Sequence, residues 1–367
     1  MDRRNHIRLE GGIFIEILDY LKDAVDRESS DVFIIAGQPV TYKIQGQLVA
    51  RDEPRLEPAD TERLIRGIYS LTADRSPEMA ISGGDDDFSI AVPGLSRFRI
   101  NVYKQRGSLA AVIRVITFDL PDPEKIGIPQ TVMNLTNRTK GLILVTGTAG
   151  SGKSTTLACL IDQINHTRSD HIVTLEDPLE YLHRHRKSIV SQREISTDTE
   201  SYVKALRASL RQSPDVVLLG EMRDHETINV AMTAAETGHL VFSTLHTVGA
   251  ANTIDRVIDA FPPNQQNQIR VQLSMVLQAV VSQQLIPTLD NKIVPAFEIM
   301  IVNNAVRNMI RESKIHQIDT VIYSSAAEGM LAMDASLLSL YKGGIISDKN
   351  AIIYSTNPEV MAKKLLL

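Results

Sequence analysis

One glycine-rich segment in the middle of the chain has the residue types and spacing to bind phosphate. Residues 147–154 read Gly-Thr-Ala-Gly-Ser-Gly-Lys-Ser, between the apolar run 141–146 and a helical pattern that extends to about residue 164. A G-x-x-x-x-G-K-S segment between a strand and a helix is typical of a phosphate-binding loop (P-loop). Glycines let successive backbone amides turn toward a phosphate, and the N-terminus of the following helix adds positive potential.

The side chains of this loop suit a nucleotide that carries Mg²⁺. We expect Lys153 to neutralise β- and γ-phosphate oxygens and Ser154 to offer its hydroxyl to the metal. The alternative is a glycine-rich turn with an incidental lysine. The residues expected to bind ATP are Gly147, Thr148, Ala149, Gly150, Ser151, Gly152, Lys153, Ser154 and Thr155.

Carboxylates follow two other apolar runs. Glu176, Asp177 and Glu180 come after the run 172–175, at a position where open α/β sheets collect ligands. They are expected to hold Mg²⁺ mostly through water, although a solvated acidic turn is the alternative. Glu221 follows the run 216–219, and we expect it to be the catalytic base that activates the attacking water. Its alternative role is that of an acid at a helix N-terminus.

Two histidines flank the apolar run 240–242. His246 is expected at the same sheet edge as the P-loop, where it would contact the γ-phosphate, and His239 is expected at the other end. Each could equally be a satisfied structural histidine. The basic segment 183–187 is expected to be a solvated loop.

The surrounding pattern predicts two different domains. Residues 1–118 mix helical spacing with short alternating runs, which indicates an α+β domain. The segment 119–129 begins with a Pro-rich acidic stretch and is expected to be a linker. In residues 130–367, continuous apolar runs alternate with helices, which predicts an α/β domain with a parallel sheet. The last hundred residues are expected to be mostly helical, including apolar positions between 269 and 281 at helical spacing.

Length and composition limit the protein classes. The chain has 367 residues, enough for two domains with real cores. Its single cysteine, Cys159, closes no intrachain disulfide, and we expect neither a secretory signal nor a span of about 20 apolar residues. The formal net charge of -5 argues against a dedicated nucleic-acid binder.

The four motifs, in this order and at these spacings, resemble the Walker A, Asp box, Walker B and His box segments of the secretion ATPase superfamily of type II and type IV machines. Residues 305–312, Ala-Val-Arg-Asn-Met-Ile-Arg-Glu, are similar to the A-I-R-N-L-I-R-E signature of the PilT-type retraction ATPases of type IV pili. Residues 329–341 resemble that group as well, and residues 253–262 and 282–285 resemble the helical C-terminal region of the wider superfamily. Departures at Val32 and Phe33, Ala149, Val306 and Met309 bear on the subtype.

This resemblance implies a PAS-like N-terminal domain and a RecA-like ATPase domain with C-terminal helices. It further implies a homo-hexamer with ATP between subunits, in which Arg99 and Arg114 of the first domain act on the phosphates. The implied function is an ATP-hydrolysing motor for pilus retraction and twitching motility. It would be cytoplasmic and reach the membrane through an inner-membrane platform protein of the pilus machine.

Three alternatives stay open at this point. The first is a type II or type IV secretion ATPase or a pilus-assembly ATPase. Assembly relatives typically carry a four-cysteine zinc module, which a chain with Cys159 alone cannot build. The others are a nucleotide-sensing scaffold that does not hydrolyse ATP, and a DNA translocase.

Overall fold

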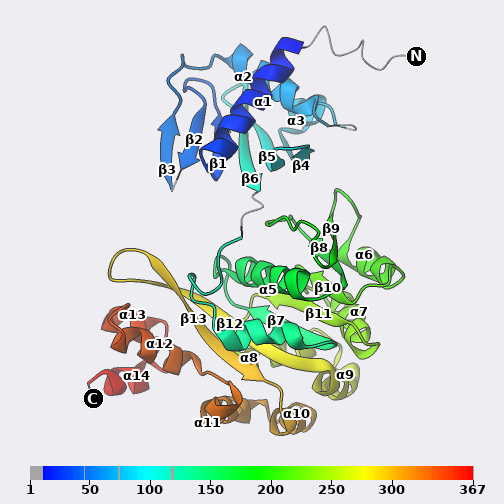
Figure 1. The fold of residues 1–367 in the computed structure, drawn as a ribbon, viewed down its shortest axis with the longest axis vertical. Helices are drawn as coiled ribbons and strands as arrows, with labels where there is room; N and C mark the ends of the chain where they lie inside the picture. The colour runs from blue at the N-terminus through cyan, green and yellow to red at the C-terminus, as the bar shows by residue number, and fades with distance from the viewer. Residues whose placement is uncertain (1–10, 45, 73–74, 117–119, 367) are drawn as a thin grey trace. The chain divides into compact units, whose positions relative to one another are not determined.

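The structure is a computed structural model that describes residues 11–44, 46–72, 75–116 and 120–366, without the side chains of residues 11–16. The chain divides into two compact units, Met1–Phe118 and Asp119–Leu367, and each is described by itself (Figure 1).

The N-terminal unit is an antiparallel sheet with helices packed against it. Its sheet has the strand order β3-β2-β1-β6-β5-β4, and α1 packs beside α2, which lies on β6. Tyr42, Phe98 and Ile113 are fully buried in its core. The elements are α1 (Gly11–Asp26), β1 (Asp31–Ile34), β2 (Thr41–Ile44), β3 (Gln47–Ala50), α2 (Pro58–Tyr69), α3 (Glu78–Gly83), β4 (Asp85–Val92), β5 (Ser96–Gln105) and β6 (Ser108–Ile116).

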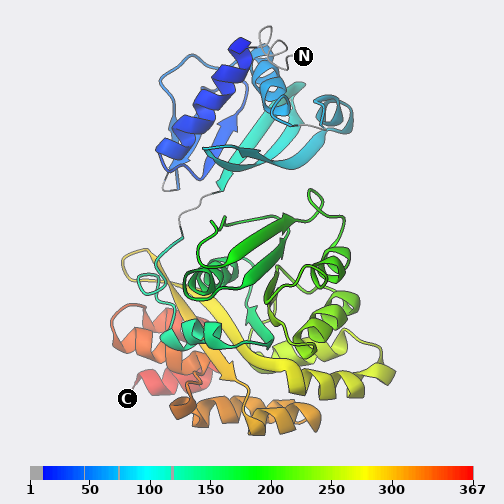
Figure 2. The same ribbon diagram turned by 45° about the vertical axis from the view of Figure 1, so that its right-hand side comes forward.

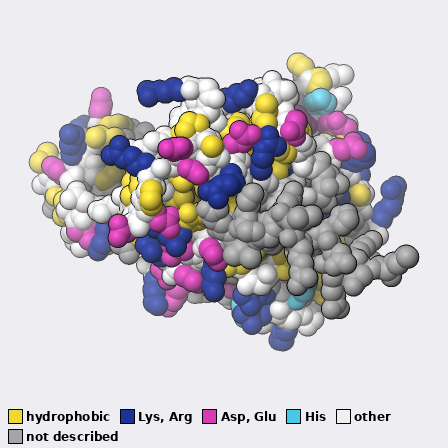
Figure 3. Space-filling model, turned by 90° about the horizontal axis from the view of Figure 1, so that it is seen from above, with side chains coloured by type: hydrophobic (Ala, Val, Ile, Leu, Met, Phe, Trp, Pro, Cys, Tyr) yellow, Lys and Arg dark blue, Asp and Glu magenta, His cyan; other side chains and the backbone are white. Residues whose placement is uncertain are grey.

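Charged side chains of both signs cover the face drawn in Figure 3. Lys and Arg lie among Asp and Glu there, and the visible described residues form no single basic patch on that face. Mixed charges of this kind do not produce the one-signed field that attracts a polyanion.

The second unit is built on a seven-stranded sheet with the order β13-β12-β7-β11-β10-β8-β9. All neighbouring strands are parallel except β12 and β13, which form an antiparallel hairpin. The strands are β7 (Gly141–Thr146), β8 (His171–Glu176), β9 (Ile189–Glu194), β10 (Val216–Leu219), β11 (Leu240–Leu245), β12 (Leu277–Pro287) and β13 (Ile293–Ile301).

Helices cover both faces of this sheet, and the strands are apolar on both sides for that reason. On β7, Ile143 and Val145 face the core under α4 and α5, whereas Leu142 and Leu144 face the core under α6 to α11. The helices are α4 (Gln130–Met133), α5 (Lys153–Thr167), α6 (Tyr202–Ser209), α7 (His225–Glu236), α8 (Ala250–Asp259), α9 (Pro263–Val276), α10 (Asn304–Arg311) and α11 (Ile318–Ser324).

The C-terminal helices α12 (Met333–Lys342), α13 (Asp348–Ile353) and α14 (Pro358–Leu365) form a separate small core against the β12–β13 hairpin. Figure 2 shows these red and orange helices beside the yellow hairpin. No helix among the described residues is long and apolar enough to cross a bilayer.

One prediction for this region is wrong. The apolar positions from Ile269 to Val281 have helical spacing, but helix α9 ends at Val276 and strand β12 begins at the next residue. Val280 and Val281 are both buried because β12 lies between β7 and β13 and is covered on both faces. A strand covered in this way has adjacent apolar residues, so its pattern is the same as that of a buried helix.

Candidate nucleotide site

The predicted P-loop joins the end of β7 to the start of α5. Gly147, Gly150 and Gly152 all have positive φ values, of 143°, 75° and 85°. A side chain at Gly147 would collide with the backbone oxygen of Gln283, 2.3 Å from an ideal Cβ, so the close approach of β12 requires glycine there.

A cavity of about 560 Å³ lies over this loop at the carboxyl ends of the parallel strands. The cavity is large enough for a small ligand, and its position matches the usual ligand-binding edge of such sheets. It is lined by P-loop residues 149–155 and by residues from the ends of β8, β10 and β11. The non-loop residues are Glu176, Asp177, Pro178, Glu180, Tyr181, His183, Tyr202, Leu218, Gly220, Glu221, Arg223, Thr244, His246 and Leu285, together with Leu157 and Ala158 of α5.

Lys153 is held against the loop itself. Its Nζ donates hydrogen bonds to the carbonyl oxygens of Gly147 (2.9 Å) and Thr148 (2.8 Å). Burial lowers the pKa of Lys153, while the charges of Glu180 and Glu221 oppose that shift, so both carboxylates act on this ammonium group. The Oγ of Ser151 is buried without a partner among the described residues. A loop with unused donors and a buried ammonium group fits a phosphate group.

Glu221 and His246 meet in this cavity. His246 Nε2 lies 3.5 Å from Glu221 Oε2, and Arg223 forms an ion pair with the other oxygen of that carboxylate. The Glu221 side chain is mostly buried, whereas that of His246 is exposed. Two hydrogen bonds to the backbone of Gly220 fix this strand end. Gly220 N donates to Leu175 O, and the side-chain hydroxyl of Thr244 donates to Gly220 O.

Acidic residues at and just after the end of β8 also line the cavity, beside the end of the neighbouring strand β10. Glu176, Asp177 and Glu180 all line it. Burial is the main cause that raises the pKa of Glu176 to about 7, and Glu180 adds to the rise. Within the described part of the chain, no three His, Cys, Asp or Glu side chains are grouped closely enough to hold a metal directly. Carboxylates that line one cavity can hold Mg²⁺ through the water molecules of its shell.

One predicted site residue of the second unit, His239, lies away from this cavity. His239 precedes β11, with Nδ1 2.9 Å from Ala234 O, at the opposite end of the strand from His246. His239 and His246 lie at opposite ends of β11, and the P-loop lies at the end that carries His246. One chain therefore cannot bring both histidines to its own P-loop.

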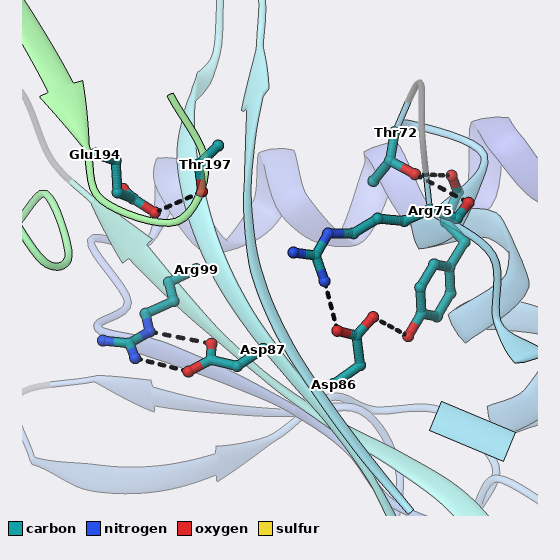
Figure 4. A network of polar contacts seen from close by, with 8 residues as sticks. Thr72, Arg75, Asp86, Asp87, Arg99, Glu194 and Thr197 are labelled. Carbon is teal, nitrogen blue, oxygen red and sulfur yellow. Dashed lines mark hydrogen bonds and ion pairs between the residues drawn. The ribbon is translucent and has the colours of Figure 1, made fainter. Parts of the chain in front are cut away.

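Arg99 and Arg114 occupy directly opposed positions on β5 and β6 of the N-terminal unit. The Arg99 guanidinium donates two hydrogen bonds to the Asp87 carboxylate, from Nε to Oδ1 (3.1 Å) and from Nη2 to Oδ2 (2.6 Å) (Figure 4). Arg114 Nε lies 3.2 Å from Asp31 Oδ1, and its side chain is exposed.

Tyr181, Tyr202 and His183 are among the side chains of the cavity that were not predicted. Tyr181 shares a hydrogen bond of 2.9 Å with Thr155, and Tyr202 lies where a side chain at Gly220 would point. His183, predicted to be solvated, instead lines the cavity, and burial lowers its pKa to about 4, so it is neutral at pH 7. The loop between β8 and β9 folds back onto α5, and no local pattern signals that long-range contact.

A second cavity, of about 360 Å³, lies beside the start of α5. Thr155 and Thr156 form part of its wall, and Ile126, Ile128 and Leu285 make much of the rest apolar. Gln283 lines this cavity and also contacts the P-loop, because its backbone oxygen lies 2.3 Å from an ideal Cβ at Gly147. Its Oε1 accepts a hydrogen bond of 2.7 Å from Thr156 Oγ1.

A P-loop between a parallel strand and its helix, with an acid at the end of a neighbouring strand, defines a P-loop NTPase. The comparison with known sequences gives the family. A profile of the Type II/IV secretion system protein family matches residues 10–329, and the chain belongs to that family.

Individual relatives are similar over nearly their whole length. The Type IV pilus retractation ATPase PilT of Pseudomonas aeruginosa is 41% identical, covering 94% of this chain and 99% of that protein. A twitching motility protein of Neisseria gonorrhoeae is 40% identical, with coverages of 95% and 93%. The crystal structure of the pilus retraction motor PilT with bound ADP superposes with a TM-score of 0.84, at 47% identity, covering 94% of this chain and 98% of that one.

Proposed function

We propose that this chain is an ATP-hydrolysing motor that powers the retraction of type IV pili and so twitching motility. The observation that carries the proposal is the cavity that joins the P-loop to Glu221, in a chain that matches a PilT retraction ATPase along almost all of its length. The ADP bound in the similar PilT structure supports a nucleotide ligand here.

ATP binds with its phosphates on residues 147–155 in this proposal. Lys153 exchanges its two carbonyl contacts for phosphate oxygens, which are stronger partners because they are charged. The base occupies the apolar cavity beside Thr155 and Thr156. Ser154, Glu176, Asp177 and Glu180 hold Mg²⁺, mostly through water. When bound, the metal neutralises charge on the phosphate oxygens.

Glu221 takes the proton of the attacking water, and His246 beside it contacts the γ-phosphate. Arg223 pairs with Oε1 of Glu221, which leaves Oε2 of that carboxylate to accept the proton. Arg99 and Arg114 supply positive charge to the phosphates, exchanging Asp87 and Asp31 for phosphate oxygens. Because His239 lies at the end of β11 opposite the P-loop, it could contact only a nucleotide bound to an adjacent copy of the chain.

The assembly that this function requires is a homo-hexamer. We infer a PAS-like domain at residues 1–118, a linker at 119–129 and a RecA-like ATPase domain at 130–367. The motor is cytoplasmic and acts at the membrane through the inner-membrane platform protein of the pilus machine. The resemblance of the N-terminal and C-terminal segments to retraction ATPases supports this organisation.

Steady-state phosphate release from the purified protein tests the chemistry. Glu221→Gln keeps the shape of the side chain but cannot take a proton, so we expect it to bind ATP and to lose at least about a hundredfold in turnover. Lys153→Ala is expected to lose both turnover and nucleotide binding, in contrast to Glu221→Gln. Wild-type turnover in either variant would refute its assigned role, and a wild-type protein that binds ATP without turnover would instead be a nucleotide sensor.

Deletion of the gene tests whether the protein drives pilus retraction, pilus assembly or protein secretion. A retraction motor leaves cells with too many pili that cannot twitch, and the Glu221→Gln gene should fail to restore motility. Loss of all pili would indicate an assembly ATPase, and unchanged pili with impaired protein export would indicate a secretion ATPase.

A further inference from the structure

Glu298 is a buried carboxylate on β13 that lies outside the cavity yet connects to its wall. Only 8% of its surface is exposed. Its Oε1 accepts a hydrogen bond of 2.7 Å from the backbone amide of Ala250, the first residue of α8. Ala250 follows the segment Thr247–Gly249, which begins directly after His246. The carboxylate therefore holds the far end of the loop that carries His246.

The contact is part of a polar row across three strands. Glu298 lies opposite Ser282 on β12, and Ser282 lies opposite Thr146, the last residue of β7 before the P-loop. Ser282 Oγ accepts a hydrogen bond of 2.9 Å from Gly249 N. Adjacent residues of the same loop are thus bound to adjacent strands of the sheet, and the row leads directly to the P-loop.

Thr253 of α8 also binds the segment between His246 and α8. Its hydroxyl lies 2.7 Å from that of Thr247 and donates to Gly249 O, also at 2.7 Å. A weaker contact of 3.4 Å joins it to Thr146 Oγ1. The segment between His246 and α8 consequently has fixed partners on both sides, so the position of His246 is set by the sheet.

Burying the Glu298 carboxylate costs free energy, which a purely structural residue at this position would not need to spend. Burial raises the pKa of Glu298, and the nearby acids Asp319 and Asp334 raise it further, whereas the amides of Ala250 and Met333 favour the charged form. A Ser, Thr, Asp or Asn in the N-cap position would satisfy a helix start locally, but α8 begins after Gly249. The acceptor comes instead from a strand 48 residues away. Such a long link fixes the loop to the sheet, which a local cap would not do.

We propose that Glu298 is a positioning residue for ATP hydrolysis, which sets His246 against Glu221 by anchoring the first amide of α8. This inference rests on the proposed ATPase site. Glu298 does not line the cavity in which ATP is proposed to bind, so its effect on turnover passes through His246.

The test compares turnover and nucleotide affinity in the full-length protein. In Glu298→Asp the charge is kept but the side chain is shorter by one methylene, so the carboxylate no longer reaches Ala250. In Glu298→Gln an oxygen that can accept that hydrogen bond is kept. We expect kcat to fall about tenfold in Glu298→Asp with KM within twofold of wild type, and to be restored to at least half in Glu298→Gln.

A double-mutant cycle separates positioning from general damage. In the His246→Ala background, Glu298→Asp should cause no further loss of kcat, because the group that it positions is already absent. Asp86 of the N-terminal unit has the same exposed fraction, 8%, and Asp86→Asn is the matched control, expected to lower the melting temperature but not kcat.

Three results would overturn the inference: wild-type kcat in Glu298→Asp, equal losses in the Asp and Gln variants, or independent losses in the cycle. Failure of the proposed function itself is recognised separately, because Glu221→Gln would then retain turnover. If Glu221→Gln is inactive while the Glu298 variants behave as wild type, only the positioning role fails.

Discussion

The hydrogen bond between Thr156 and Gln283 joins α5 to β12 beneath the P-loop, and its removal has a calculable effect. Thr156 is 1% exposed and Gln283 is 3% exposed, so neither side chain gains a water partner when the other is replaced. Gln283→Met keeps the length of the side chain and removes its acceptor. An unpaired buried hydroxyl costs about 1–3 kcal/mol in free energy of unfolding. Because the Thr156 hydroxyl can turn to a carbonyl of its own helix, we expect a loss in the lower half of that range.

The assay is thermal unfolding of each variant, followed by far-UV circular dichroism because the chain has no tryptophan. In a unit of this size each kcal/mol corresponds to about 2–4 °C in melting temperature. Thr156→Val should cause a similar loss in free energy of unfolding, because it leaves the side-chain oxygen Oε1 of Gln283 without its donor. The double variant removes both partners and should lose clearly less than the sum of the two single losses. Strictly additive losses, or single variants as stable as wild type, would refute the reasoning.

Two further outcomes follow from local geometry. Gly147→Ala forces the loop away from the backbone of Gln283, so ADP affinity should fall at least about tenfold in a titration. Gly238→Ala also strains a positive φ but meets nothing within 4 Å and lies far from the loop, so unchanged affinity in both variants would refute the argument. Cys159 is 3% exposed and burial raises its pKa to about 11, so native protein at pH 8 should resist a thiol reagent that labels it fully in denaturant. Rapid labelling of the native protein would contradict the buried position.

The site was predictable where the chemistry is local. The P-loop glycines, Lys153 and Glu221 lie within short segments whose spacing reflects a strand that leads into a loop. The structure brings them together because parallel strands end at one sheet edge. His246 was also predicted at that edge, and it lies 3.5 Å from Glu221.

The supporting residues were not predictable in the same way. Gln283 reaches Thr156 across 127 residues of sequence, and Glu298 reaches Ala250 across 48. Neither has a spacing that marks its role, because the partner is chosen by the order of strands in the sheet. The same order explains the error at β12, whose buried valines are typical equally of a helix and of a central strand.

The strand order also has a consequence for how the protein is made. β7, which carries the P-loop, lies between β11 and β12, and β12 is the last but one of the strands that the described residues form along the chain. A growing chain on the ribosome that ends before Leu277 therefore has a complete P-loop sequence but lacks the strand against which Gly147 and Thr156 pack. Synthesis proceeds from the N-terminus, so the nucleotide site is completed only after more than three quarters of the chain has been translated. The nascent chain therefore acquires its nucleotide site only when β12 has been made, after the elements from α1 to α9.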